Sequence, residues 1–432
     1  MLFRLNFFDI KNNKSSFFFL LFICLVPIFL PFSIFVSDLS LVISCIFFLI
    51  EIYKNKNKDI FFNKFSLIFF ISYLYLIINS FYSLNTILAF ESSLFYFRFY
   101  IYSLSIYYCL RKYHLFLSFY FFSILTSFLI VIVDAYIQLF FGFNLIGYEY
   151  HNGWKRLSGI FGDEYILGSY LSRIMPLILA LFFHPQIKID KKISKSIVLI
   201  ILSSILIIFS GERVALLNLI IFLFLFLLFI RISYLKLIII FLFFLTFTSI
   251  IVLSNDITKK RIYDFTLYQI FEGDKINIFS VQHQLIYETA FKIFNDNKLL
   301  GIGPKNFRVL CKKYKSYSDL DRSVDGCATS PHNMYVQILV ETGIIGFVPF
   351  VALFLILFLL IFMRVFKINF LNFNPKNLVH YDLLLIPFFI SFFPLNPTGN
   401  IFNNWMSIIY YLPLGFLMMY NYNNKNEPFY KS

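Results

Sequence analysis

The stretch IIGFVPFVALFLILFLLIF, residues 344–362, contains no charged side chain. An α-helix needs about 20 predominantly apolar residues to cross the hydrocarbon layer of a bilayer, so this stretch predicts a membrane-spanning helix. Similar runs recur along the chain. With 432 residues, 59% hydrophobic and 14% charged, and a mean hydropathy of +0.78, the composition is that of a polytopic membrane protein and excludes an ordinary soluble globular fold.

The high phenylalanine content and the positive net charge do not by themselves indicate a function. The 63 phenylalanines indicate a compositional bias, so aromatic stripes are interpreted as lipid-facing or core residues rather than as a cofactor site. The net charge of +14 does not indicate nucleic-acid binding, because most Lys and Arg lie in short loops beside apolar runs.

The apolar runs predict an all-α polytopic membrane protein with about twelve transmembrane helices. They are centred near residues 25, 44, 73, 99, 127, 176, 203, 222, 244, 354, 388 and 410. Pro27, Pro31, Pro387 and Pro394 favour re-entrant or broken helices in the second and eleventh runs. The first run begins near Ser16 without a convincing cleavage site, so we expect a retained helix rather than a signal peptide.

The distribution of basic residues predicts the orientation, because cytoplasmic short loops carry an excess of Lys and Arg. With a cytoplasmic N-terminus, the short segments on that side hold Arg4, Lys11, Lys14, Lys54, Lys56, Lys58, Lys64, Arg111, Lys112, Lys188, Lys191, Lys192, Lys195, Arg231, Lys236, Arg364, Lys367, Lys376, Lys425 and Lys431. The opposite short loops hold only Lys155, Arg156 and Arg213. We therefore predict a multi-pass protein of the cell inner membrane with both termini in the cytoplasm.

This topology divides the chain into three parts. Residues 1–254 are predicted to hold helices one to nine, residues 255–333 a periplasmic loop domain, and residues 334–432 helices ten to twelve with a cytoplasmic tail. The loop domain is exempt from the charge rule because of its length, and we expect a helix around residues 282–294. It contains Cys311 and Cys327, for which a disulfide and free thiols are both open.

Charged side chains inside a bilayer are costly and usually face a cavity or a partner. Five occur in the predicted spans, most of them in the outer half of the membrane: Glu91 and Arg98 on the fourth span, Asp134 on the fifth, Arg173 on the sixth and Arg213 at the start of the eighth. They predict a polar cavity that opens outward. The alternative for Glu91 and Arg98, which lie two helical turns apart, is structural pairing with neighbouring side chains.

Arg213 is the most informative of these residues. It follows Glu212 in a short outer connection and begins a helix whose free N–H groups face the predicted cavity. A guanidinium beside a helix N-terminus is stabilised by an anion that binds both, and phosphate suits that arrangement. The alternative is a simple ion pair between Arg213 and Glu212.

The stretch SPHNMYVQILVETG, residues 330–343, contains a candidate general base. We expect Ser330 to cap a helix, Pro331 to take the first helical position and His332 to lie in the first turn. Gly343 is expected to end or bend this helix. The helix N-terminus disfavours an imidazolium, so His332 would be neutral and able to accept a proton at the outer membrane boundary. The alternative is a structural or interfacial histidine.

The order of these residues resembles a known family. Arg213 and Leu217 form an Arg-x3-Leu pattern, and His332 and Gly343 form a His-x10-Gly pattern. Between them the long outer segment contains LLGIGPKNF, residues 299–307. The set resembles the superfamily of O-antigen ligases and O-antigen polymerases, which are bacterial polytopic membrane glycosyltransferases. RLSGIFGDEYILGSYL, residues 156–171, is similar to the family segment before the sixth span, so that the resemblance covers roughly residues 150–350.

The resemblance implies a metal-independent, inverting glycosyltransferase without a cofactor. Its donor would be a glycan linked to undecaprenyl diphosphate, and its acceptor a sugar of lipid A-core or another glycan. His332 would take the proton from the acceptor hydroxyl, while Arg213 and a second arginine would bind the diphosphate. The implied partners are therefore this donor, this acceptor and membrane lipids.

The second arginine is expected to be Arg261. Family members often carry an Arg and a Trp shortly before the Gly-rich stretch, but this chain has QHQLIYETAFKIF, residues 282–294, in that place. Lys259, Lys260 and His283 therefore remain alternatives to Arg261. The candidates for binding the substrate are Arg156, His283 and Gly343.

Several functions share these sequence features. Transfer of O-antigen to lipid A-core is the first reading, and an O-antigen polymerase and a protein O-oligosaccharyltransferase are variants with the same chemistry and another acceptor. A glycolipid flippase or transporter is an alternative of a different class. Transporters usually have two related halves, and this sequence shows no evident repeat.

Overall fold

The computed structural model describes residues 14–150, 156–230, 232–254, 256–271, 279–317, 325–366 and 379–426. Within these ranges the protein is all-helical, as predicted, with isolated β-bridges but no strand. Some basic residues used to predict the orientation lie outside the described residues: Arg4, Lys11, Lys155, Arg231, Lys367, Lys376 and Lys431.

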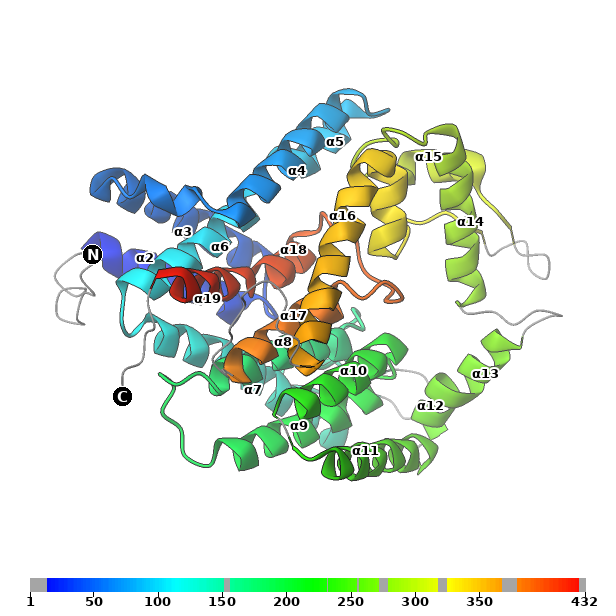
Figure 1. Ribbon diagram of the computed structural model, residues 1–432. Helices are drawn as coiled ribbons and strands as arrows, with labels where there is room; N and C mark the ends of the chain where they lie inside the picture. The colour runs from blue at the N-terminus through cyan, green and yellow to red at the C-terminus, as the bar shows by residue number, and fades with distance from the viewer. Residues whose placement is uncertain are drawn as a thin grey trace.

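The helices follow one another with short connections in the first part of the chain (Figure 1). They are α2 (Lys14–Phe29), α3 (Ile34–Asn55), η1 (Lys58–Phe61), α4 (Lys64–Phe81), α5 (Thr86–Ser93), α6 (Phe97–Lys112), α7 (Phe116–Phe141), η2 (Gly159–Phe161), α8 (Leu167–Phe182), α9 (Lys192–Phe209), α10 (Arg213–Phe229) and α11 (Tyr234–Ser254). They continue with α12 (Asp256–Thr258), η3 (Lys259–Asp264), α13 (Phe265–Ile270), α14 (Val281–Asp296), α15 (Phe307–Tyr314), α16 (Met334–Phe366), α17 (Val379–Ser391), α18 (Asn404–Tyr411) and α19 (Leu414–Asn426).

Each of the predicted span centres lies within one of these helices, but the helices differ in length. Among the described residues, 6 helices are long and apolar enough to cross a membrane, namely α3, α4, α7, α9, α11 and α16. The apolar helices α2, α8, α10 and α17 are shorter. At about 1.5 Å per residue, a helix of that length covers less than the roughly 30 Å of hydrocarbon. Length and composition therefore support 6 spans, fewer than the sequence predicts.

The long helices expose apolar side chains that water would not favour. Only 6% of the most apolar window of α16 is buried within the protein, and the values for α4 and α11 are 11% and 17%. Continuous apolar surfaces of this kind require a lipid environment or a partner. Their composition and exposure together indicate a membrane protein.

The helix α8 forms the centre of the bundle. Nearly all of its side chains are buried, and it packs against α7, α9, α10 and α17, which gather in the middle of the molecule in Figure 1. It carries the buried Arg173, whose Nη1 donates a hydrogen bond of 2.7 Å to Ser169 Oγ. The main core thus combines α8 with side chains of shorter and longer helices alike.

A second, smaller core lies beside the first part of α16. Ile286 and Ile293 of α14, Phe307 of α15 and Val340 of α16 belong to one buried cluster, separate from the main core. Figure 1 shows α14 and α15 next to this part of α16. The helix expected around residues 282–294 is confirmed by α14, and its docking positions the residues that precede α16.

A kink at Gly343 divides α16, which confirms the expected bend. Gly343 has φ 64° and ψ −170°, and a methyl group on it would collide with the carbonyl of Leu299. The glycine-rich stretch lies directly against the kink, because Ile302 N donates to Val340 O at 3.1 Å and Gly303 N to Glu341 O at 2.8 Å. These bonds satisfy carbonyls of the interrupted helix.

The expected arrangement of Glu91 and Arg98 on one span is wrong. Glu91 lies in α5 and Arg98 in α6, because the chain turns between Leu94 and Tyr96. Arg98 forms a salt bridge of 3.0 Å with Asp38 of α3, so its pairing with a neighbouring side chain is confirmed. Such pairing explains a charge at membrane depth without a functional site.

Candidate functional site

His332 lies in the turn before α16, not in its first turn as predicted. The helix begins at Met334, and Asn333 caps it in place of Ser330, since Asn333 Oδ1 accepts from Tyr335 N at 2.9 Å and Val336 N at 3.1 Å. His332 has φ 54°, a left-handed conformation that non-glycine residues rarely adopt. Such backbone strain persists only where surrounding contacts hold it.

The ring of His332 meets the ring of His283. Their centroids are 5.9 Å apart and their planes lie at 80°, so the contact is edge to face. Ser280 caps α14 and lies 2.6 Å from His283 Nδ1 through its hydroxyl oxygen, which orients the His283 ring. Nε2 is then the nitrogen of His283 that remains for a further partner.

Both imidazoles favour the neutral form. Burial lowers the pKa of His332 below its ordinary value of 6.5. Burial also lowers the pKa of His283, and repulsion from His332 and Arg213 adds to it, to about 4. The direction agrees with the expectation for His332, but its cause is burial and not the helix N-terminus. A neutral histidine near pH 7 is able to accept a proton.

Arg213 does not pair with Glu212, although the two are adjacent in sequence. Arg213 Nη1 donates to Gln269 Oε1 at 2.6 Å, within α13. The carboxylate of Glu212 instead accepts from Gly168 N at 2.7 Å and Ser169 N at 3.0 Å, at the N-terminus of α8. The N-terminus of α8 binds the carboxylate of Glu212, so the guanidinium of Arg213 forms hydrogen bonds to neutral side chains.

Arg156 and Arg261 both lie close to Gly211. A methyl group on Gly211 would be 3.8 Å from Arg156 Nε and 3.8 Å from Arg261 Cβ. Arg156 Nε donates to Ser210 O at 3.0 Å, and its guanidinium lies over the ring of Tyr165 at 5.0 Å. Burial lowers the pKa of Arg156, and repulsion from Arg261 and Arg213 acts in the same direction against the attraction of Glu212.

These three arginines, Arg156, Arg213 and Arg261, are called the arginine cluster below. Across the part of the chain that the structure describes, the salt bridges are Arg98 with Asp38, Lys112 with Glu51, Lys315 with Asp325 and Arg364 with Asp382. None involves the arginine cluster. Glu212 attracts Arg156, but it forms no salt bridge with the cluster and is bonded instead to the N-terminus of α8. Guanidinium groups that gather without a salt bridge can bind an anion, and phosphate oxygens match their geometry. The charge of Arg213 lowers the pKa of His283, so the cluster acts electrostatically on the imidazole pair.

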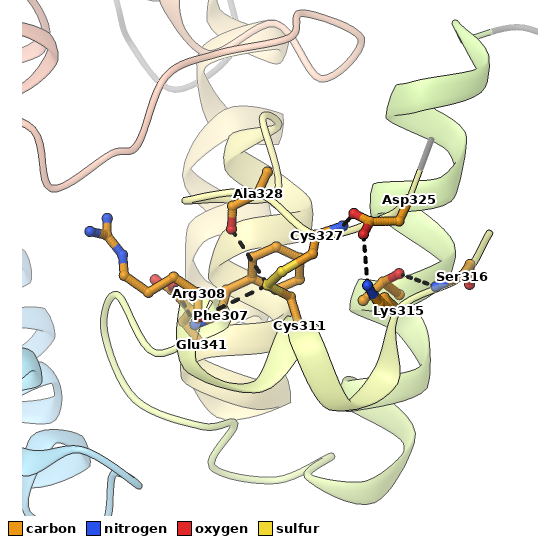
Figure 2. Close-up of a disulfide and its surroundings, with 10 residues drawn as sticks. Phe307, Arg308, Cys311, Lys315, Ser316, Asp325, Cys327, Ala328 and Glu341 are labelled. Atoms are coloured by element: carbon orange, nitrogen blue, oxygen red, sulfur yellow. Dashed lines mark hydrogen bonds and ion pairs between the residues drawn. A yellow bond between two sulfur atoms is a disulfide. The ribbon is translucent and has the colours of Figure 1, made fainter. Parts of the chain in front are cut away.

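A disulfide anchors the segment that leads to His332. Cys311 of α15 and Cys327 are bonded, with 5.0 Å between their Cα atoms, so of the two outcomes left open by the sequence the structure has the disulfide. Figure 2 shows the bond beside the ring of Phe307, and Lys315 forms a salt bridge of 2.9 Å with Asp325 on the same segment. Two crosslinks therefore tie this segment to α15.

Gly343 and Asp134, two further residues singled out in the sequence, have structural contacts. Gly343 is buried under Leu299 and Gly301, where it shapes α16. Asp134 accepts from Asn144 Nδ2 at 3.2 Å and Leu145 N at 3.0 Å and holds a loop. A pocket is lined by Arg156, Tyr148, Ser158 and Tyr165, and none of the five charged residues that predicted an outward cavity lines it.

Sequence analysis missed Gln269 and the connection between α17 and α18. Gln269 has no motif to distinguish it. The connection does have a signal, because PLNPTGN, residues 394–400, interrupts an apolar region with residues that favour turns.

Comparison with known proteins adds the family. Within the described ranges, no group of three or more His, Cys, Asp or Glu is placed to hold a metal ion. No curated protein matches the chain. Residues 198–351 match the family model described as O-Antigen ligase, a family of glycosyltransferase-like enzymes. With the apolar helices, this match indicates an integral protein of the bacterial inner membrane. The matched segment contains Arg213, Arg261, His283 and His332, and the match supports the resemblance of this chain to the O-antigen ligase superfamily.

Proposed function

We propose that this protein transfers a glycan from undecaprenyl diphosphate to a sugar of lipid A-core on the periplasmic side of the inner membrane. The observation that carries the proposal is the arginine cluster, which forms no salt bridge among the described residues, and the pair of half-buried imidazoles on which its charge acts. Diphosphate is the anionic group of the donor, and a neutral imidazole is the base that activation of a sugar hydroxyl requires. The reaction needs neither metal nor cofactor.

The proposed topology has twelve spans, cytoplasmic termini and a periplasmic loop domain at residues 255–333. A helix lies at every predicted centre, and 6 of these helices are long and apolar enough to cross a membrane among the described residues. The disulfide between Cys311 and Cys327 supports the periplasmic placement, since disulfides persist in oxidising compartments.

In the proposed reaction, the acceptor hydroxyl oxygen attacks the anomeric carbon of the donor sugar. The new bond forms between that oxygen and that carbon, while the bond from the carbon to the phosphate oxygen breaks. The electron pair of the broken bond stays on undecaprenyl diphosphate, and the hydroxyl proton moves to a ring nitrogen of His332. Attack from the side opposite the diphosphate inverts the configuration, and the imidazolium then releases its proton to water.

The arginine cluster divides the charge of the diphosphate. Arg213 and Arg261 would hold the two phosphates and stabilise the negative charge that grows as the bond breaks. Arg156 would contact phosphate or the first sugar from its pocket. His283 would donate a hydrogen bond to substrate through Nε2, and Gly343 would act indirectly, by giving α16 the shape that places His332.

Reconstitution tests this proposal. The full-length protein in proteoliposomes, supplied with carrier-linked donor and lipid A-core, should form a glycosidic product. His332→Ala should lower turnover by about 10² to 10⁴-fold, the usual contribution of a general base, while membrane insertion stays intact. Transbilayer movement of the donor without any product would overturn the proposal in favour of a transporter.

A cellular experiment separates ligase from polymerase. Deletion of the gene should leave unmodified lipid A-core together with long carrier-linked chains, because the final transfer is missing. Lipid A-core that bears a single repeat would instead identify a polymerase. Loss of glycan from a protein, with normal lipopolysaccharide, would identify a protein O-oligosaccharyltransferase.

A further inference from the structure

The connection between α17 and α18 holds the backbone of His332. Thr398 N donates to His332 O at 2.8 Å, and Asn333 Nδ2 donates to Pro394 O at 2.7 Å. Asn333 and Pro397 also form an isolated β-bridge. The unusual backbone of His332 is thus fixed by a segment more than sixty residues later in the chain.

The same connection binds the helix that begins with Arg213. Asn396 Nδ2 donates to Asn218 Oδ1 at 2.7 Å and to Ile390 O at 2.9 Å. Asn218 lies on α10, between one and two helical turns after Arg213. A chain of hydrogen bonds therefore runs from α10 through Asn396 to the turn that carries His332.

A third contact holds the first turns of α16. Gln337 Nε2 donates to Asn400 Oδ1 at 3.0 Å, and Ile401 N donates to Gln337 Oε1 at 3.1 Å. The segment from 394 to 402 is therefore bonded to α10, to the turn before α16 and to α16 itself. We call this segment the asparagine brace.

Burial makes the brace selective for one geometry. The exposed fractions of Asn218, Asn396 and Asn333 are 0%, 1% and 4%. A buried amide that loses its partner carries the full desolvation penalty, so a shifted arrangement of these helices is disfavoured. Apolar residues would fill the space in this apolar bundle, but they would not define the position of His332 to the accuracy of a hydrogen bond.

We propose that Asn396 is a positioning residue, which sets the ring of His332 at its working position relative to Arg213 through the asparagine brace. This inference rests on the proposed function, because it assigns the two braced residues to the base and to the diphosphate. A base and a phosphate ligand act on the two ends of one reacting centre, so a displacement of about 1 Å between them is sufficient to slow transfer by about 10²-fold.

The test uses two substitutions of the partner amide in the full-length, reconstituted protein. Asn218→Leu keeps the shape but removes the oxygen that accepts from Asn396, whereas Asn218→Asp keeps an accepting oxygen. We expect Asn218→Leu to lower kcat/KM for transfer by about 10²-fold and Asn218→Asp to retain more of the activity. Asn396→Ala combined with Asn218→Leu should lose no more than Asn396→Ala alone, because the bond between the two amides is already absent from the single variant.

A second measurement reads the position of His332 directly. Diethyl pyrocarbonate modifies neutral imidazoles, and mass spectrometry of the peptide gives the rate for His332 at each pH. In Asn218→Leu the ring should become more solvated, so its modification should accelerate several-fold and its pKa should rise toward 6.5. His283, whose ring contacts that of His332, is its titratable neighbour.

Asn63→Ala is the matched control. Asn63 caps α4 by accepting from Ser66 N at 2.9 Å, and it lies in a connection predicted to face the cytoplasm. Its loss should lower stability by about 1 kcal/mol and leave the modification rate of His332 unchanged.

The outcomes separate this inference from the proposed function. If wild-type protein makes no product, or His332→Ala equals wild type, the proposed function fails. The modification experiment still tests the brace, since it needs no substrate. Where wild type is active and Asn218→Leu behaves like Asn63→Ala in both measurements, Asn396 does not position His332 and the inference is overturned.

Discussion

The imidazole rings of His283 and His332 pack edge to face, with 5.9 Å between their centroids. One ring comes from α14 and the other from the turn before α16, so the pair exists only because these segments dock through their shared core. Both rings are half-buried, and burial lowers the pKa of each, with repulsion from His332 and Arg213 adding to the shift of His283. A neutral base beside an arginine cluster is the chemical basis of the proposed transfer.

The pH dependence of transfer should follow from the lowered pKa of His332. A base works in its neutral form, and a pKa below 6.5 keeps the ring neutral at neutral pH and below it. We expect kcat/KM to be constant as the pH falls from about 8 toward 6.5, and to decrease only when the pH passes the lowered pKa. Steady-state rates across this range measure it. An acid limb centred above 6.5 would contradict a buried His332 as the base.

Arg213→Lys should retain charge but lose activity. Lysine lacks the planar fork that binds two phosphate oxygens and cannot keep the bond to Gln269 in the same geometry. Loss of one donor to a developing negative charge typically lowers kcat by about 10² to 10³-fold. Arg111→Lys, at the end of α6, is the control with the same chemical change in a region predicted to be cytoplasmic. Near wild-type turnover for Arg213→Lys would make Arg213 a structural residue.

Gly343→Ala should destabilise the protein and reduce transfer. The left-handed backbone costs a residue with a Cβ about 1–2 kcal/mol, and the new methyl group would also collide with Leu299 O. Gly399→Ala is the control, because its methyl group would meet only Met406 Cγ at 3.6 Å. Thermal unfolding in detergent compares the two variants. Equal midpoints would show that the close approach at Gly343 is not required.

Loss of the disulfide should loosen the segment before His332. Cys311 and Cys327 are separated by 16 positions, and closing a loop of that size contributes about 3 kcal/mol in the chain-entropy description. Cys311→Ser with Cys327→Ser should therefore lower transfer several-fold, whereas Cys24→Ala, a free cysteine in α2, should not. Alkylation of the wild-type protein without reductant provides a direct check. Rapid labelling of Cys311 or Cys327 would contradict both the bond and the periplasmic placement.

Local sequence explains most of the helices and one element of the site. A helix satisfies its own backbone hydrogen bonds, so an apolar run forms one with little regard for its neighbours. The bend at Gly343 was likewise predicted, because only glycine tolerates that backbone without strain. The sequence does not predict where α16 begins, because Ser330 and Asn333 are both residue types that cap helices well. Contacts of Asn333 with Pro394 and Asn396, remote in sequence, favour Asn333.

The sequence by itself determined an all-helical membrane protein, the segment that holds the site and the identity of Arg213 and His332 as its candidates. Only the tertiary structure decided which distant residues meet. It brings Arg156 and Arg261 close to Gly211, and His283 into contact with His332. It also links α10, through Asn396, to the turn before α16. The physical reason is the distance along the chain over which each effect acts. Hydropathy and backbone preferences act within a few residues, whereas these contacts join segments whose approach depends on how buried helices pack and on which buried amides find partners.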